Sequence, residues 1–150
     1  TPKNIYQRPA NVFVSTFIGL SNILNGMLER NDNGKAIIRI GKYKFQMNNL
    51  IKDCGTNRFV KISVRPEEFI INKDTDEGIP VTVKNSVFLG VATHYFVETK
   101  EGQEIEVIQN SDMEELIPNG TMIHLKVQEQ KINVFNEDGS KSFIDREVRL

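Results

Sequence analysis

Few residues in this chain have the types and spacing that chemistry requires. The two histidines, His94 and His124, fall in alternating apolar segments without the nearby cysteines or carboxylates of a zinc site, so both are expected at ordinary strand positions. The run Asp74–Gly78 resembles a calcium-binding loop, but its glycine comes one place early and Asn85 stands where the bidentate glutamate belongs. A solvated turn is expected there, and no metal site is predicted.

The sequence also gives little support for a nucleophilic cysteine or for a nucleotide-binding site. Cys54, the single cysteine, lies beside Gly55 with no histidine near it in sequence, which favours a structural thiol over a nucleophile. One cysteine excludes an internal disulfide and is typical of a reducing compartment. No segment has the Gly-x-x-x-x-Gly-Lys-Ser/Thr pattern of a phosphate-binding loop. No catalytic or cofactor-binding residue is therefore predicted.

Composition and charge set the class of protein. At 150 residues, 39% hydrophobic and 26% charged, the chain is typical of one soluble globular domain. Nineteen basic and 20 acidic residues give a net charge of −1, which provides no broad attraction to nucleic acid or to an anionic membrane. The stretch 9–28 carries no charge, but its asparagines, serines and threonine argue against a membrane helix. The first residue is not methionine, which suggests a fragment, and the cytoplasm is the expected location.

Beyond Gly19 the apolar residues alternate, which predicts strands. The Asn31–Gly34 turn and the Lys100–Gly102 turn each predict a hairpin. Ile23, Leu24, Met27 and Leu28 are expected to open a strand region. Residues expected on buried strand faces are Val60, Ile62, Val64, Ile79, Val81, Val83, then Val87 and Leu89, and finally Ile123, Leu125, Val127, Ile132 and Val134. One turn of helix is predicted over 111–116. This pattern favours a mainly β barrel or sandwich over a helical fold, and the barrel is preferred. The two similar hairpins indicate that each half of the sequence contributes a unit of five strands.

The opening of the chain has a different period. Thr1 and Pro2 favour a helix start, Pro9 ends that short helix, and a second helix is predicted from about Ala10 to Ile18. Phe13 and Phe17 share one flank of the second helix with Val14 and Ile18. That apolar flank needs a partner, so Phe13 and Phe17 are interface candidates.

Three segments carry a resemblance to a known family. The opening resembles the Thr-Pro-x-x-Ile-Tyr-x-x-Pro-x-Asn-x-Phe-Val-x-x-Phe-Ile-Gly segment of ATP-binding cassette (ABC) importer ATPases, apart from Ser15, where alanine is more usual. Residues 59–68, which contain Val-Arg-Pro-Glu, and residues 85–90 resemble strands of the TOBE regulatory domain that follows the cassette. The resemblance implies that residues 1–20 are a helical tail of the missing nucleotide-binding domain and residues 21–150 an OB-like TOBE β domain.

The resemblance also implies a role. Such a chain would be the regulatory and dimerisation domain of an ATPase subunit, with ATP and Mg²⁺ held by the missing cassette and no catalysis by the fragment itself. Its implied partners are a second copy, the ATPase domain and, through the whole protein, permease subunits at the inner face of the cell membrane. The Tyr95-Phe96-Val97 hairpin and the Phe-Ile-Gly-x-x-Asn run from Phe17 to Asn22 look most like the spermidine/putrescine class, although iron, sugar and phosphonate importers share much of the pattern.

Two alternative functions are also considered, together with the Pro66 corner and an acidic hairpin. An OB-type module for single-stranded nucleic acid would need a basic groove with stacking aromatics, and a small-oxyanion sensor would need converging amides and hydroxyls. Arg65 and Glu67, either side of Pro66, are regulatory or interface candidates, although a simple strand-to-turn cap explains them equally. The acidic run from Glu98 to Glu106 is interpreted as a solvated hairpin that discourages edge pairing.

Overall fold

The computed structural model describes residues 21–110 and 116–145. The two helices predicted within residues 1–20, and with them Phe13 and Phe17, lie outside the described residues, as does most of the helical turn predicted over 111–116. Within the described chain, helical structure consists of two three-residue 3-10 turns, η1 (Lys52–Cys54) and η2 (Pro66–Glu68). No helix in these residues has the length and hydropathy to cross a membrane.

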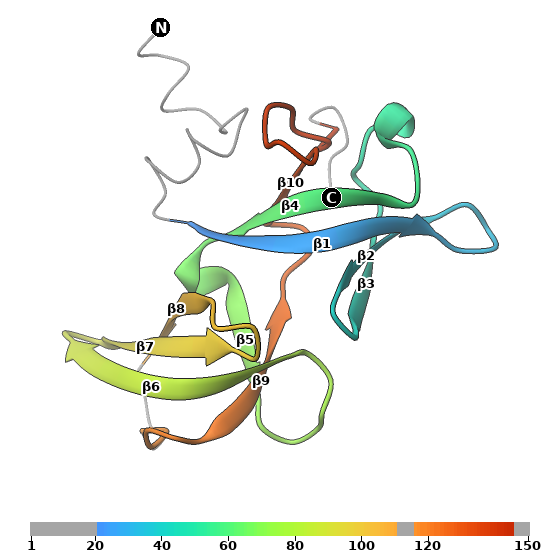
Figure 1. The fold of residues 1–150 in the computed structure, drawn as a ribbon. Coiled ribbons are helices and arrows are strands. Elements are labelled where there is room, and N and C mark those ends of the chain that lie inside the picture. Colours follow the sequence, from blue (N-terminus) through green and yellow to red (C-terminus); the bar gives the residue numbers. More distant parts are fainter. Residues whose placement is uncertain (1–20, 111–115, 146–150) are drawn as a thin grey trace, which may run out of the picture. The chain divides into compact units, whose positions relative to one another are not determined.

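The described residues form ten strands, which make two antiparallel sheets of five strands, one in each of two compact units (Figure 1). The described part of unit 1 is residues 21–65 and 129–145, and unit 2 is Pro66–Gln128. Unit 1 contains β1 (Asn22–Arg30), β2 (Ala36–Ile40), β3 (Tyr43–Met47), β4 (Arg58–Val64) and β10 (Asn133–Phe135). Unit 2 contains β5 (Phe69–Asn72), β6 (Ile79–Leu89), β7 (Ala92–Thr99), β8 (Glu104–Asn110) and β9 (Met122–Val127). The predicted mainly β, OB-like fold is confirmed.

In the sequence, unit 2 is inserted between β4 and β10, two strands that pair with each other in the unit 1 sheet. The strand order of unit 1 is β10-β4-β1-β2-β3, and β10 pairs with β4 through Asn133 opposite Ser63 and Val134 opposite Ile62. Two five-stranded units were predicted, but the expectation that each half of the sequence forms one of them is wrong. The last strand of unit 1 follows unit 2 in the sequence, and the two parts of unit 1 are joined by long-range pairing.

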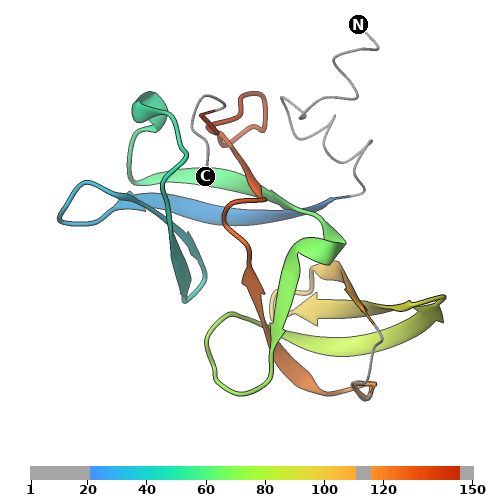
Figure 2. The ribbon, with the colours of Figure 1, turned by 180° about the vertical axis from the view of Figure 1, so that it is seen from behind.

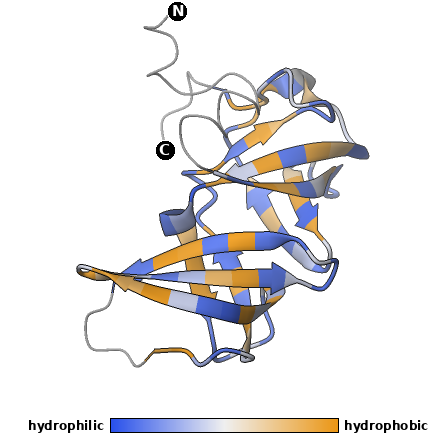
Figure 3. Cartoon of the chain, turned by 60° about the vertical axis from the view of Figure 1, so that its left-hand side comes forward, coloured by the Kyte–Doolittle hydropathy of each residue, from blue (hydrophilic) through white to orange (hydrophobic). Residues whose placement is uncertain are grey.

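The core of unit 1 lies on one face of its sheet, as the alternation of hydrophobic and hydrophilic residues along the strands indicates (Figure 3). Its buried apolar side chains include Leu24, Leu28, Ile38, Ile40, Tyr43, Met47, Val60, Ile62, Val64, Ile132 and Val134. Gly26 sits among them in β1, where an added Cβ would lie 2.6 Å from Ile62 Cδ1 and 2.9 Å from the carbonyl oxygen of Arg39. Glycine is required there because the neighbouring side chains and backbone already fill the space.

The sheet of unit 2 has the order β5-β9-β6-β7-β8, and Figure 2 shows β5 beside β9 from behind. Its buried apolar residues include Phe69, Ile79, Val81, Val83, Tyr95, Val97, Ile105, Val107, Ile123, Leu125 and Val127. The hydroxyl of buried Tyr95 accepts a hydrogen bond from the backbone N–H of Ile117 at 3.1 Å. The polar end of this large side chain is therefore satisfied inside the core.

A β-bulge between Val83 and Asn85 divides β6 into two parts. Before the bulge, Val81 and Val83 are buried, whereas beyond it Val87 and Leu89 are 39% and 56% exposed. The strand continues as predicted, but the expectation that Val87 and Leu89 extend the buried face is wrong. The extra residue shifts the register by one, and a one-residue shift exchanges the faces of all following side chains.

The turns follow the predicted chemistry. In the β1–β2 hairpin the N–H of Gly34 donates to the carbonyl of Asn31 at 2.9 Å, and Gly34 adopts a φ of 77°. The 73–78 loop is a turn organised by Asn72, whose side-chain oxygen accepts from the N–H groups of Asp74 and Thr75. Asn72 Nδ2 also donates to Thr75 Oγ1 at 2.6 Å. The predicted turn is therefore present, and hydrogen bonds of the Asn72 side chain define it.

Candidate interaction surfaces

The corner that contains Arg65 and Glu67 is built around a buried proline. β4 ends at Val64, Arg65 is exposed, Pro66 is buried as the first residue of η2, and Glu67 is exposed. Two glutamine side chains hold the following backbone: Gln128 Nε2 donates to the carbonyl of Glu68 at 3.3 Å and Gln109 Nε2 donates to that of Phe69 at 3.1 Å. The structure thus places both candidate side chains on the surface, one on either side of a fixed proline.

Cys54 is a buried thiol within a cluster of arginine contacts in unit 1. Arg30 donates to Cys54 Sγ at 3.3 Å, to the carbonyl of Gly55 at 3.2 Å and to that of Gly34 at 3.0 Å. Arg58 donates to the carbonyl of Cys54 at 3.2 Å, and its guanidinium lies 4.9 Å from the centre of the Phe143 ring. These contacts tie η1 to the β1–β2 turn, so the cluster positions the backbone and the interpretation of Cys54 as a structural residue is supported.

The outward side of the unit 1 sheet carries a surface that we call the basic face. It includes Met27, Ile37, Arg39, Lys44, Phe59 and Lys61, and the register places Glu29, Asn25 and Gln46 on the same side. The register places Phe59, Met27, Arg39 and Lys44 in one row across β4, β1, β2 and β3. Phe59 is 60% exposed, which is unusual for an aromatic residue in the middle of a sheet.

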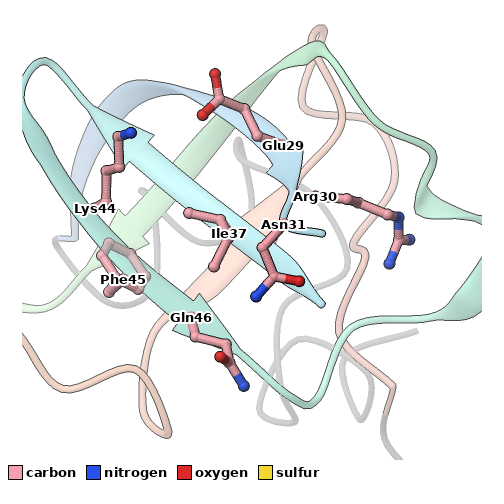
Figure 4. A pocket seen from close by; sticks show the side chains of 7 residues that line it. All are labelled: Glu29, Arg30, Asn31, Ile37, Lys44, Phe45 and Gln46. Atoms are coloured by element: carbon pink, nitrogen blue, oxygen red, sulfur yellow. The ribbon is translucent and has the colours of Figure 1, made fainter. Parts of the chain in front are cut away.

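Arg39 and Lys44 are directly opposite each other in this row. Arg39 Nε also lies 3.1 Å from Glu29 Oε2, so one of the two cations is balanced locally. A shallow hollow of about 380 Å³ adjoins the pair and is lined by Glu29, Arg30, Asn31, Ile37, Lys44, Phe45 and Gln46 (Figure 4). Lys61 is held on the same side of the sheet by donating to Asn25 Oδ1 at 3.2 Å.

The outward side of the unit 2 sheet carries the opposite charge, and we call it the acidic face. It consists of Val87, His94, Phe96, Glu98, Glu104, Glu106 and Ile108. Glu98 and Glu104 are directly opposite each other, and Glu106 Oε1 lies 2.9 Å from His94 Nδ1. Phe96 is 40% exposed beside these carboxylates. A solvated hairpin, as the sequence predicted, explains the charges here but not the exposed aromatic ring.

These two faces suit binding to another surface better than they suit covalent chemistry. Within residues 21–110 and 116–145, no group of three or more histidine, cysteine or acidic residues is placed to hold a metal ion. His94 and His124 occupy positions in β7 and β9, as the sequence predicted. Sequence reasoning missed the basic face, because its members come from four strands and only their register brings them together.

The comparison with protein families decides the class of the chain. A family model for the TOBE domain matches residues 62–135, from within β4 to the end of β10. This chain carries a TOBE domain. The match includes all of unit 2, the end of β4 and the whole of β10, the unit 1 strands that precede and follow unit 2 in the sequence.

The relatives of this TOBE-containing chain are ATP-binding proteins of importers. It is 48% identical over 145 residues to an Fe(3+) ions import ATP-binding protein of Fusobacterium nucleatum, covering 96% of this chain and 38% of that protein. It is 36% identical over 131 residues to a spermidine/putrescine import ATP-binding protein of Thermobifida fusca, covering 83% of this chain and 34% of that protein. The chain therefore spans somewhat more than a third of each relative. The predicted resemblance to importer ATP-binding subunits is confirmed.

A solved structure supports the fold of the TOBE-containing chain. The molybdate-bound form of the cytoplasmic molybdate-binding protein ModG matches with a TM-score of 0.60 at 12% sequence identity, covering 77% of this chain and 95% of that one. At this identity the likeness concerns the fold alone.

Proposed function

We propose that this chain is the regulatory and pairing part of the ATP-binding protein of an importer, and that the importer takes up ferric iron. The observation that carries the proposal is the 48% identity to an Fe(3+) import ATP-binding protein over 96% of the chain. The sequence segments favoured the polyamine class, and relatives from spermidine/putrescine importers at 27 to 36% identity keep that class as the second candidate. Both solutes are cations.

The proposed role divides the work within the whole protein. ATP and Mg²⁺ bind in a cassette outside this chain, which has no phosphate-binding loop of its own. This chain binds a second copy and so keeps two cassettes together, while permease subunits contact the whole protein at the cytoplasmic face of the membrane. A pair of rigid β units suits this role because close-packed cores hold an interface without changing shape.

The interface candidates from the sequence remain part of the proposal. Phe13 and Phe17 belong to an apolar flank that the rest of the whole protein or a second copy would cover. Arg65 and Glu67 would contact a partner from the Pro66 corner, a position that is supported by their exposure on a fixed turn. The nucleic-acid and oxyanion-sensor hypotheses stay predictions from the sequence, since a likeness in fold at 12% identity carries no ligand.

Replacing the matching segment of each relative by this chain tests the proposal. We expect a chimera of the Fusobacterium nucleatum protein to support uptake of radiolabelled Fe³⁺ in cells that lack the parent protein. The matched control is the same protein without the segment. A parallel chimera of the Thermobifida fusca protein, assayed with radiolabelled spermidine, tests the second candidate. An iron chimera that accumulates to the parent level but supports no uptake would contradict the proposal.

A further inference from the structure

Charge is distributed unequally between the two units. Of the 19 basic and 20 acidic residues, residues 66–128 contain 4 and 12, which leaves 15 and 8 for the rest of the sequence. The net charges are therefore −8 for the unit 2 range and +7 for the remainder, although the whole chain has a net charge of only −1. Such a difference within one chain favours contacts between surfaces of opposite sign.

The same opposition appears in detail on the two sheet faces. On the basic face, Arg39 and Lys44 are directly opposite each other, and on the acidic face Glu98 and Glu104 are. Like charges at directly opposite positions of an antiparallel sheet destabilise the isolated sheet. On the basic face the charge of Arg39 is balanced by Glu29, and on the acidic face Glu106 Oε1 lies within hydrogen-bond distance of His94 Nδ1. Uncompensated charge of one sign therefore remains on each face.

Each face also has an apolar centre that an interface would bury. Phe59 stands beside Met27 on the basic face, and Phe96 stands beside the acidic pair. Exposed aromatic rings next to charged residues are typical of protein interfaces, in which the ring is buried and the charges form the rim. The two faces are thus similar in plan and opposite in charge.

We propose that the basic face of one copy binds the acidic face of a second copy, in a two-fold pair. The inference rests on the proposed function, in which two copies meet, and it identifies the surfaces. In a two-fold pair each contact is made twice, so both faces of both copies are used. The lysines of the basic face then lie over the acidic face of the second copy, and the two phenylalanine rings are covered.

Charge reversal tests the proposal on the 150-residue chain itself. The basic-face variant is Lys44→Glu with Lys61→Glu, and the acidic-face variant is Glu98→Lys with Glu104→Lys. We expect each to raise the dissociation constant of the pair by about tenfold or more, because like-charge contact across an interface is strongly unfavourable. The controls, Lys35→Glu with Lys52→Glu and Asp74→Lys with Asp76→Lys, make the same charge changes at exposed sites outside the faces and are expected to have little effect.

Mixing the two variants distinguishes a specific contact from a general effect of charge. In a mixed pair both contacts again join opposite charges, so we expect the basic-face and acidic-face variants to form a heterodimer about as tight as the parent pair. A single chain with all four changes should also pair with itself. Restored pairing in either form demonstrates that the variants are folded.

Three results would overturn the proposal. In the first, charge reversal on the faces changes the dissociation constant no more than it does in the control variants. The chain would then still form a dimer, but through other surfaces. Another is a mixture that forms no heterodimer. In the third, the parent chain stays monomeric in low salt. That result would indicate that the opposite charges attract each other within one copy and not between two. Failure of iron uptake in the chimera would instead concern the proposed function and leave these surfaces intact.

Discussion

Glu98 of β7 and Glu104 of β8 lie directly opposite each other on the outward side of the unit 2 sheet. A pair of like charges at such positions costs the sheet stability, and the aromatic ring of Phe96 is 40% exposed beside them. Both features disfavour the isolated chain, and both are relieved if a basic surface covers them. The arrangement therefore favours binding over stability.

Neutralising one of these carboxylates should separate the two effects. We expect Glu98→Gln to raise the free energy of unfolding of the monomer by about 0.2 to 1 kcal/mol, because the cross-strand repulsion is removed. The same change should weaken self-association. Denaturant unfolding at low protein concentration measures the first effect and sedimentation the second. A variant that is less stable than the parent, or that associates more tightly, would show that the pair does not act as described.

The close packing around Gly26 should make β1 intolerant of a side chain. An added Cβ would lie 2.6 Å from Ile62 Cδ1 and 2.9 Å from the Arg39 carbonyl oxygen, so Gly26→Ala is expected to lower the free energy of unfolding by about 1 to 3 kcal/mol. Because the two units can unfold separately, amide hydrogen exchange of unit 1 residues is the measurement that reports the loss in its free energy of unfolding. The control is Asn25→Ala, at the neighbouring exposed position, for which protection should change little. Equal protection in the two variants would argue against the packing.

The buried proline at the corner should matter more for folding than for binding. Pro66 is buried at the start of η2, so Pro66→Ala both removes apolar contact and frees the backbone of the unfolded chain. We expect a loss of about 1 kcal/mol in the free energy of unfolding with an unchanged dissociation constant of the pair. Pro118→Ala, at an exposed proline, is the control. Thermal melts that equal the parent's, combined with weaker pairing, would reverse the assignment.

The turn that follows β10 should respond to acid. The hydroxyl of Ser140 and then its backbone N–H, which donates to Asp138 Oδ1 at 2.9 Å, hold the pKa of Asp138 below its usual value of 3.8. Because the folded-state pKa is the lower one, these bonds stabilise the turn at pH values above the unfolded-state pKa. That stabilisation is lost as the pH falls through the folded-state pKa.

An NMR titration of the Asp138 carboxyl carbon measures this effect. We expect Ser140→Ala to move the pKa of Asp138 upward toward 3.8, and Ser140→Thr, which keeps a hydroxyl, to leave it low. Identical titration curves for the parent and Ser140→Ala would remove the hydroxyl as the main cause.

Much of the fold was predictable from local sequence. The Asn31–Gly34 turn and the turn at Gly102 carry their own conformational signals, so both hairpins and their strands were predicted correctly. Alternation also placed Val60, Ile62 and Val64 on a buried face. These features depend on neighbours a few residues apart, which is the range that sequence patterns report.

What failed depends on pairing between distant segments. The bulge between Val83 and Asn85 is defined by the register of β6 against β7, so the alternation through Val87 and Leu89 gave the wrong face. The pairing of β10 with β4 could not be predicted, because the alternation at Ile132 and Val134 indicates a strand but does not show with which strand it pairs. The two charged faces exist only once the register sets Arg39 opposite Lys44 and Glu98 opposite Glu104.

The mass of the parent chain in solution, measured by sedimentation equilibrium at several salt concentrations, tests the central claim most directly. We predict twice the chain mass of 17.1 kDa in low salt. The dissociation constant should rise with added NaCl, because the Debye length falls from about 10 Å at 0.1 M to about 3 Å at 1 M and screens the contact. A mass of 17.1 kDa at every salt concentration and at high protein concentration would contradict pairing. A dimer indifferent to salt would contradict pairing through the charged faces.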